Sequence, residues 1–335
     1  GTLFHTVMDV NPTVAMYIAA FIIVAYTFLG GFSAVCWTDF FQGMIMLAAL
    51  LIAPLFALAL AKAGDGAVAG ATLPEGFFNF FTTPQDILSG LGWGLGYFGM
   101  PHIIIRFMSL KSEKELRKSS VIGISWTAII LIMSALTAVA GRLYLGEIDD
   151  PSTVFITMVR RIFPALVSGL LLSAILSAAM STADSQLLAA SSAFASDVYK
   201  PVIRKKASDS EMLWAGRIVV IVIAVVALMI ASDPNSGSIM GLVENAWGVF
   251  GAAFGPVILL SLFWKRLTFG GTVAGIAAGA AVDILWLVFL SSTDIYEIVP
   301  GFAAGLLAAV VVSLLSKGPG KDVEDLFDRA VDLKS

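Results

Sequence analysis

Residues 86–105 read DILSGLGWGLGYFGMPHIII, and this stretch decides how the chain must fold. It is long and apolar enough to cross a bilayer as a helix, which takes about 20 residues, yet it contains five glycines and one proline. Glycine weakens a helix, and proline removes one of its backbone hydrogen bonds. We therefore predict a membrane helix with an unwound centre, which is tolerated only where it lines a cavity or is buried in protein. Close helix packing through small residues is the alternative interpretation of the same glycines.

The composition is typical of a membrane protein. Of its 335 residues, 58% are hydrophobic and only 13% are charged, whereas a soluble domain carries about 25% charged residues. Long apolar segments recur from one end to the other, which predicts an all-α polytopic membrane protein with one integral membrane domain over residues 1–335. The nine predicted spans are 13–32, 38–63, 86–105, 119–141, 164–190, 212–231, 239–263, 270–291 and 297–316.

The basic residues predict the orientation of these spans. When the spans alternate in direction, fifteen of the twenty Lys and Arg residues fall in loops on one side. Loops rich in Lys and Arg stay in the cytoplasm, so we expect the tail at 317–335 to be cytoplasmic. The single cysteine, Cys36, and the two histidines, His5 and His102, make a zinc site of the usual ligand types unexpected.

A second informative stretch, AAMSTADSQ at residues 178–186, gathers polar side chains inside an apolar span. Ala178, Ser181 and Thr182 are spaced to share one helix face. Two hydroxyls and a carbonyl are neutral, hard oxygens that suit Na⁺, whereas a divalent ion would demand more carboxylate charge. The alternative is that both hydroxyls bond back to carbonyls of their own helix. Three oxygens do not complete a sodium shell, so the other ligands must come from another helix.

Ionisable side chains inside spans are costly and tend to mark ion or substrate paths. Asp39 and Arg217 both lie near predicted cytoplasmic ends, and we predict that they pair, with snorkelling of Arg217 to the surface as the alternative. Asp184, Glu244 and Asp283 receive no role. The glycines at 271, 275 and 279 recur at every fourth residue and predict a helix contact.

Four separated blocks resemble the sodium/solute symporter family, and within it the bacterial sodium/proline symporters. The blocks are YTFLGGFSAVCWTDFFQ at 26–42, GWGLGYFGMPHIIIRFM at 92–108, SAAMSTADSQLLAASSAFASDVYK at 177–200 and NAWGVFGAAFGPVILLSLFWKR at 245–266. The resemblance implies a LeuT-type core of inverted repeats with interrupted helices. It also implies sodium-coupled import of a small amino acid, L-proline, by alternating access across the cell (inner) membrane. An enzyme is not expected.

Residue by residue, the resemblance implies that Ala178, Ser181 and Thr182 form part of a sodium site. It implies that Trp93, Tyr97 and Pro101 recognise proline, and that Asp39 and Arg217 take part in sodium coupling.

Two departures from the family pattern stand out. The family has more spans than the nine predicted here, so we expect a chain that lacks about the first four. Met100 stands where relatives carry Gln, which changes the polarity expected of the pocket.

Other functions stay open at this point. The substrate could be another small solute such as a sugar, a vitamin or a carboxylate, and a channel is a further alternative. A membrane-embedded hydrolase could use Asp184 with Ser181 or Ser185, but that span contains no histidine or lysine to act as a base. The expected partners are a co-transported Na⁺, a small-molecule substrate and the lipid bilayer, with no nucleic acid and no obligate protein partner.

Overall fold

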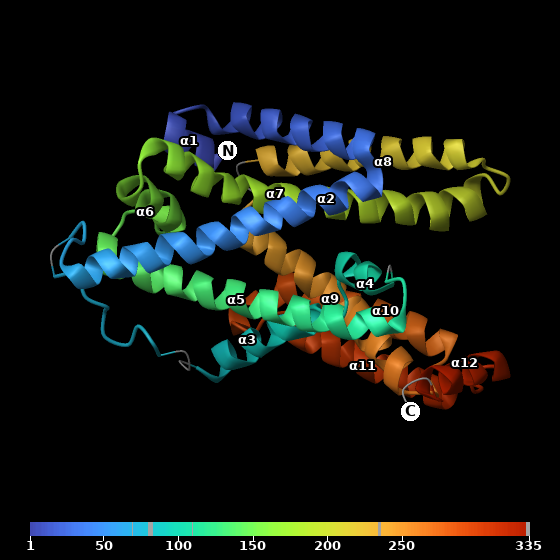
Figure 1. Ribbon diagram of the computed structural model, residues 1–335. Coiled ribbons are helices and arrows are strands. Elements are labelled where there is room, and N and C mark those ends of the chain that lie inside the picture. Colours follow the sequence, from blue (N-terminus) through green and yellow to red (C-terminus); the bar gives the residue numbers. More distant parts are fainter. Residues whose placement is uncertain (69, 80–82, 109, 234–235, 333–335) are drawn as a thin grey trace. The chain divides into compact units, whose positions relative to one another are not determined.

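The computed structural model describes residues 1–68, 70–79, 83–108, 110–233 and 236–332 (Figure 1), and for residues 32, 33, 113 and 332 it describes the backbone alone. The regular secondary structure of these residues is entirely helical. The chain divides into two compact units: unit 1 contains Gly1–Phe77 and Leu110–Pro234, and unit 2 contains Phe78–Ser109 and Asn235–Ser335. The single domain expected over residues 1–335 stays a proposal, and the units are described one at a time.

Unit 1 is built around a long bent helix, α2. Its helices are α1 (Thr2–Met8), α2 (Pro12–Ala63), α5 (Glu113–Leu145), η1 (Pro151–Thr153), α6 (Val154–Ile162), α7 (Ala165–Ala193), the π-helical η2 (Phe194–Ile203) and α8 (Asp209–Ser232). Inside α2, Gly31 has φ 62° and ψ −168°, a backbone conformation open almost only to glycine. The chain therefore bends sharply at Gly31, and Figure 1 shows the two halves of α2 running in different directions.

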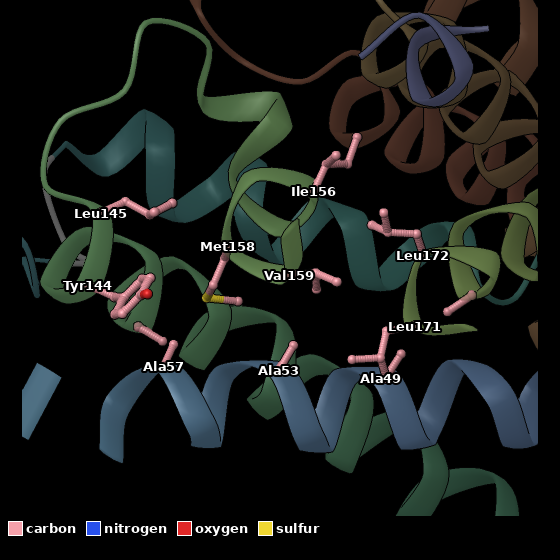
Figure 2. Close-up of a cluster of buried hydrophobic side chains, with 12 residues drawn as sticks. Ala49, Ala53, Ala57, Tyr144, Leu145, Ile156, Met158, Val159, Leu171 and Leu172 are labelled. Atoms are coloured by element: carbon pink, nitrogen blue, oxygen red, sulfur yellow. The ribbon is translucent and has the colours of Figure 1, made fainter. Parts of the chain in front are cut away.

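The core of unit 1 depends on small side chains of α2. Ala49, Ala53 and Ala57 are spaced by one helical turn, and each is at most 1% exposed. Figure 2 shows them facing larger apolar side chains from α6 and α7, among them Met158 and Leu171. Alanine brings the α2 backbone close to its neighbours, and the larger side chains fill the remaining space.

Unit 2 packs three long helices against a broken one. Its helices are α3 (Pro84–Gly96), α4 (Pro101–Met108), α9 (Ile239–Phe263), α10 (Phe269–Phe289), η3 (Ser291–Thr293), α11 (Ile298–Leu315) and α12 (Lys321–Asp332). The predicted glycine contact of α10 is confirmed. A Cβ at Gly275 would lie 2.8 Å from Val257 of α9 and 2.9 Å from Ala309 of α11, so glycine allows these helices to approach closely.

Eight helical segments in the described part of the chain are long and apolar enough to span a membrane, with the two halves of α2 counted separately, and they match eight of the nine predicted spans. The remaining span, 86–105, is interrupted as predicted: α3 ends at Gly96 and α4 begins at Pro101. The alternative interpretation of its glycines also holds, because a Cβ at Gly96 would overlap Trp247 of α9. The same glycines therefore weaken the helix and make room for a neighbouring side chain.

Candidate functional site

The break between α3 and α4 has a regular local structure. Phe98 and Gly99 donate to the carbonyls of Leu95 and Gly96, which tightens the end of α3 into a turn. Ile104 donates to the carbonyl of Met100 over 3.2 Å, so the helix resumes at Pro101. Proline suits this first helical position because its missing N–H would have no partner there. The sequence thus closes one half-helix and opens the next within four residues.

Four aromatic side chains meet on the α3 side of this break, and we call Trp93, Tyr97, Trp247 and Tyr296 the aromatic cluster. The Trp93 ring centroid lies 6.1 Å from that of Trp247 and 5.5 Å from that of Tyr296, and Tyr97 meets Trp247 edge to face at 4.9 Å. The Trp247 indole also donates to the Trp93 carbonyl over 3.0 Å. The last turn of α3 is therefore attached to α9 by both ring packing and a hydrogen bond.

The structure brings two of the predicted substrate residues together, because Trp93 and Tyr97 both contact Trp247. Pro101 lies beyond the break, at the exposed start of α4. Trp247 and Tyr296 were not predicted from the sequence as members of the cluster. Trp247 lies in one of the four family blocks, which was the available signal, whereas Tyr296 precedes a span and no motif marked it.

The predicted sodium residues of α7, in unit 1, lie around one backbone oxygen. Ser181 Oγ donates to the Ala178 carbonyl over 3.2 Å, and Thr182 Oγ1 donates to the same carbonyl over 3.0 Å. Three neutral oxygens therefore lie within one helical turn. These are also the back-bonds that the alternative interpretation expects, so the sodium site stays a prediction.

One turn further along α7, two carboxyl groups are held by hydroxyl donors across the contact with α2. Ser185 Oγ donates to Asp39 Oδ2 over 3.0 Å, and Tyr26 donates to Asp184 Oδ2 over 2.6 Å. Asp184 is fully buried. Tyr26 comes from the half of α2 before the bend and Asp39 from the half after it, so both halves contact the polar stretch of α7. From the sequence, Asp184 received a role only in the hydrolase alternative, and no motif marked Tyr26 as its partner.

Arg217 of α8 is held by aromatic residues and a backbone oxygen. Its Nε donates to the Phe28 carbonyl over 3.1 Å, and its guanidinium lies 5.0 Å from the Phe28 ring centroid and 5.1 Å from that of Trp214. A guanidinium over aromatic faces is attracted to their π electrons. The expected pair between Asp39 and Arg217 stays a prediction.

The chain is similar to known membrane transporters over almost all of its length. The sequence model of the sodium:solute symporter family matches residues 1–279. The high-affinity proline transporter PutP of Bacillus subtilis is 42% identical over 342 residues, an alignment that covers 100% of this chain and 72% of that protein. A sodium/proline symporter of Haemophilus influenzae is 44% identical over 349 residues, covering 98% of this chain and 69% of that protein.

A solved structure shows the same fold. It is a Na⁺-coupled sialic acid symporter in its substrate-bound outward-open state, with a TM-score of 0.74 at 20% identity, and the match covers 95% of this chain and 70% of that one. The fold class expected from the sequence, an all-α transporter core of the LeuT type, is confirmed by this likeness. Together with the sequence matches, it establishes that the chain belongs to the sodium:solute symporter family.

Proposed function

We propose that this protein imports L-proline together with Na⁺ by alternating access through the cell membrane, with its C-terminus in the cytoplasm. The observation that carries the proposal is the group of oxygens on α7, where Ser181 and Thr182 meet at the Ala178 carbonyl. The proline transporters of B. subtilis and H. influenzae, both above 40% identity, support the choice of ion and substrate.

The proposed sodium site on α7 offers neutral oxygens with the carboxylate of Asp39 close by. The Ser181 and Thr182 hydroxyls donate to Ala178, and each can rotate so that its oxygen lone pair points to a cation instead. Asp39 lies against Ser185, one turn from Ser181, and its charge favours a cation on this part of α7. Neutral ligands with limited carboxylate charge match a monovalent ion.

On the substrate side, the aromatic cluster offers flat apolar faces and the helix break offers backbone groups. Aromatic faces pack a small saturated ring well, and they attract a nearby ammonium group. An interrupted helix presents backbone N–H groups at the start of one half and carbonyls at the end of the other, which can bind the two charges of an amino acid. Tyr97, 49% exposed, is the member of the cluster most open to an incoming molecule.

The sodium gradient would drive the import. Each positive charge moved inward gains about 2.3 kcal/mol per 100 mV of membrane potential. That energy corresponds to a roughly fifty-fold concentration ratio of the co-transported solute. Coupling requires that bound Na⁺ raises the affinity for proline and that proline raises the affinity for Na⁺ by the same factor.

The sodium assignment is tested by Ser181→Ala and Thr182→Ala in the full-length protein. Each change removes one ligand oxygen, so we expect the sodium concentration for half-maximal proline uptake to rise at least about tenfold. Ser173→Ala is the matched control, because Ser173 on the same helix makes the same kind of back-bond, to Leu170 over 2.6 Å. Uptake in proteoliposomes at varied sodium is the measurement. An unchanged sodium dependence in both variants would contradict the sodium site.

The choice of proline is tested separately, by competition. Unlabelled proline should displace labelled proline from uptake by the wild-type protein, whereas sugars, vitamins and carboxylates in equal excess should not. If one of those solutes competed more strongly than proline, it would take the place of proline as the proposed substrate. The sodium assignment would be unaffected.

A further inference from the structure

Two acidic side chains of unit 2 converge on one glycine inside the helix packing. Asp283 of α10 is fully buried, and Glu297, the residue before α11, is 7% exposed. A Cβ on Gly248 of α9 would lie 3.1 Å from Asp283 Oδ1 and 3.3 Å from Glu297 Oε1. The two acid oxygens are therefore no farther apart than the sum of these two distances. We call Asp283 and Glu297 the acid pair.

The described residues around the acid pair offer no hydrogen-bond donor or positive charge that would offset its negative charge. Both carboxyl oxygens of Asp283 lack a hydrogen-bond partner among the described residues, and so does Oε1 of Glu297. Helices α9, α10 and α11, which surround the pair, contain no Lys, Arg or His. The Trp286 indole, three residues after Asp283, does not donate to it either, because its N–H also lacks a partner in the described part of the chain.

The other titratable groups around the pair add negative charge or none. They are Glu244 of α9 and Tyr296, whose hydroxyl donates to the Glu244 carbonyl over 2.7 Å. Helix α3, also packed against α9 and α11, has Asp86 as its only titratable side chain, in the capping box at its N-terminus. Burial raises the pKa of the Glu297 carboxyl, and the Glu244 charge raises it further. Two ionised carboxylates buried beside the same glycine would be very costly.

We propose that Asp283 and Glu297 form a proton-binding site, in which one of the two carboxyl groups is protonated and the pair carries a single negative charge. Protonation of one acid removes the repulsion between the two carboxylates. A divalent metal fits less well, because no group of three or more His, Cys, Asp and Glu in the described ranges is placed to hold one. This site is distinct from the proposed sodium residues and goes beyond sodium-coupled transport.

Glu297 and the glycine on which the acid pair converges each adjoin a member of the aromatic cluster in sequence. Gly248 follows Trp247, and Glu297 follows Tyr296. Loss of the proton would add repulsion between the two carboxylates beside Gly248, next to the positions of Trp247 and Tyr296 in the chain. Proton binding here would therefore act beside the rings that hold the end of α3.

The test is infrared difference spectroscopy of the full-length protein in lipid, recorded between about pH 5 and about pH 9. A protonated carboxyl shows a C=O band that an ionised one lacks. We expect the wild type to keep such a band at neutral pH and the double variant Asp283→Asn with Glu297→Gln to lose it. Each single variant should also lose the C=O band at neutral pH. The new amide N–H₂ can donate to the remaining carboxylate, which stabilises its ionised form.

Asp294→Asn is the control, because Asp294 is an exposed acid of the same loop in a left-handed conformation that asparagine tolerates. It should leave the band unchanged. An identical band in the wild type and the double variant would overturn the proposal, and so would a wild type without the band. If the double variant fails to fold, the two single amide variants carry the same comparison. The measurement uses neither proline nor sodium, so its failure would leave the proposed transport function untouched.

Discussion

The polar stretch of α7 in unit 1 and the acid pair of unit 2 show two ways of keeping acids inside a membrane protein. In unit 1, the buried Asp184 and the half-buried Asp39 each have one carboxyl oxygen that accepts a hydrogen bond from a hydroxyl on a neighbouring helix: Oδ2 of Asp184 from Tyr26, and Oδ2 of Asp39 from Ser185. In unit 2, Asp283 and Glu297 converge on Gly248 with their facing oxygens unpaired among the described residues. Directional hydrogen bonds position the first group, whereas close packing positions the second.

This difference follows from what each set of helices offers. The contact between α2 and α7 includes Ser and Tyr side chains, which donate without adding charge. The contact among α9, α10 and α11 is rich in glycine and alanine, which bring backbones together and donate nothing through their side chains. Unit 1 should therefore be sensitive to the loss of a hydroxyl, and unit 2 to the addition of a methyl group.

The largest effect is expected from Gly96→Ala. The added Cβ would overlap the Trp247 indole, which cannot move without losing its hydrogen bond to the Trp93 carbonyl. We expect a loss of stability of about 3 kcal/mol or more, seen as a lower melting temperature of the purified protein in detergent and as lost proline uptake.

Gly94→Ala on the same helix is the matched control for this change. Nothing lies within 4 Å of the position of a Cβ at Gly94, so alanine should be neutral or should stabilise α3 by up to about 1 kcal/mol. Equal destabilisation by both changes would mean that helix propensity, and not the fit between Gly96 and Trp247, governs α3.

A smaller effect is expected from Tyr26→Phe in unit 1. The change leaves the buried Asp184 without its 2.6 Å donor, which should cost about 2 kcal/mol in the free energy of unfolding. Tyr17→Phe is the control, because Tyr17 is 48% exposed and its hydroxyl bonds Ser232 at the surface. If both changes lower the melting temperature equally, the hydroxyl of Tyr26 does not stabilise Asp184 in the way described.

The sequence predicted what depends on local composition. The spans follow from long apolar segments, and the break after Gly96 follows from glycines and a proline within one such segment. The contact made by Gly271, Gly275 and Gly279 follows from their spacing on one helix face. Each of these features can be recognised within a window of about 20 residues.

The missed features depend on contacts between residues far apart in the chain. Tyr26 meets Asp184 across 158 positions, and the Trp247 indole reaches the Trp93 carbonyl across 154. No periodicity encodes such pairs, because they depend on which helix faces meet. Glu297 was not among the predicted ionisable residues of the spans, and only the packing shows that it lies beside Gly248 with Asp283.

The smallest effect is expected from Tyr296→Phe, which repeats the Tyr26 experiment in unit 2. The Tyr296 hydroxyl donates to the backbone carbonyl of Glu244, so the change removes a hydrogen bond to a neutral acceptor and keeps the ring packed on Trp93. We expect a cost of about 1 kcal/mol, roughly half that of Tyr26→Phe, because bonds to neutral groups contribute less than bonds to charged ones. The two melting temperatures, measured side by side in the same detergent, check the ratio. A larger loss for Tyr296→Phe than for Tyr26→Phe would reverse the contrast between the units and make hydrogen bonding, rather than packing, the main constraint on unit 2.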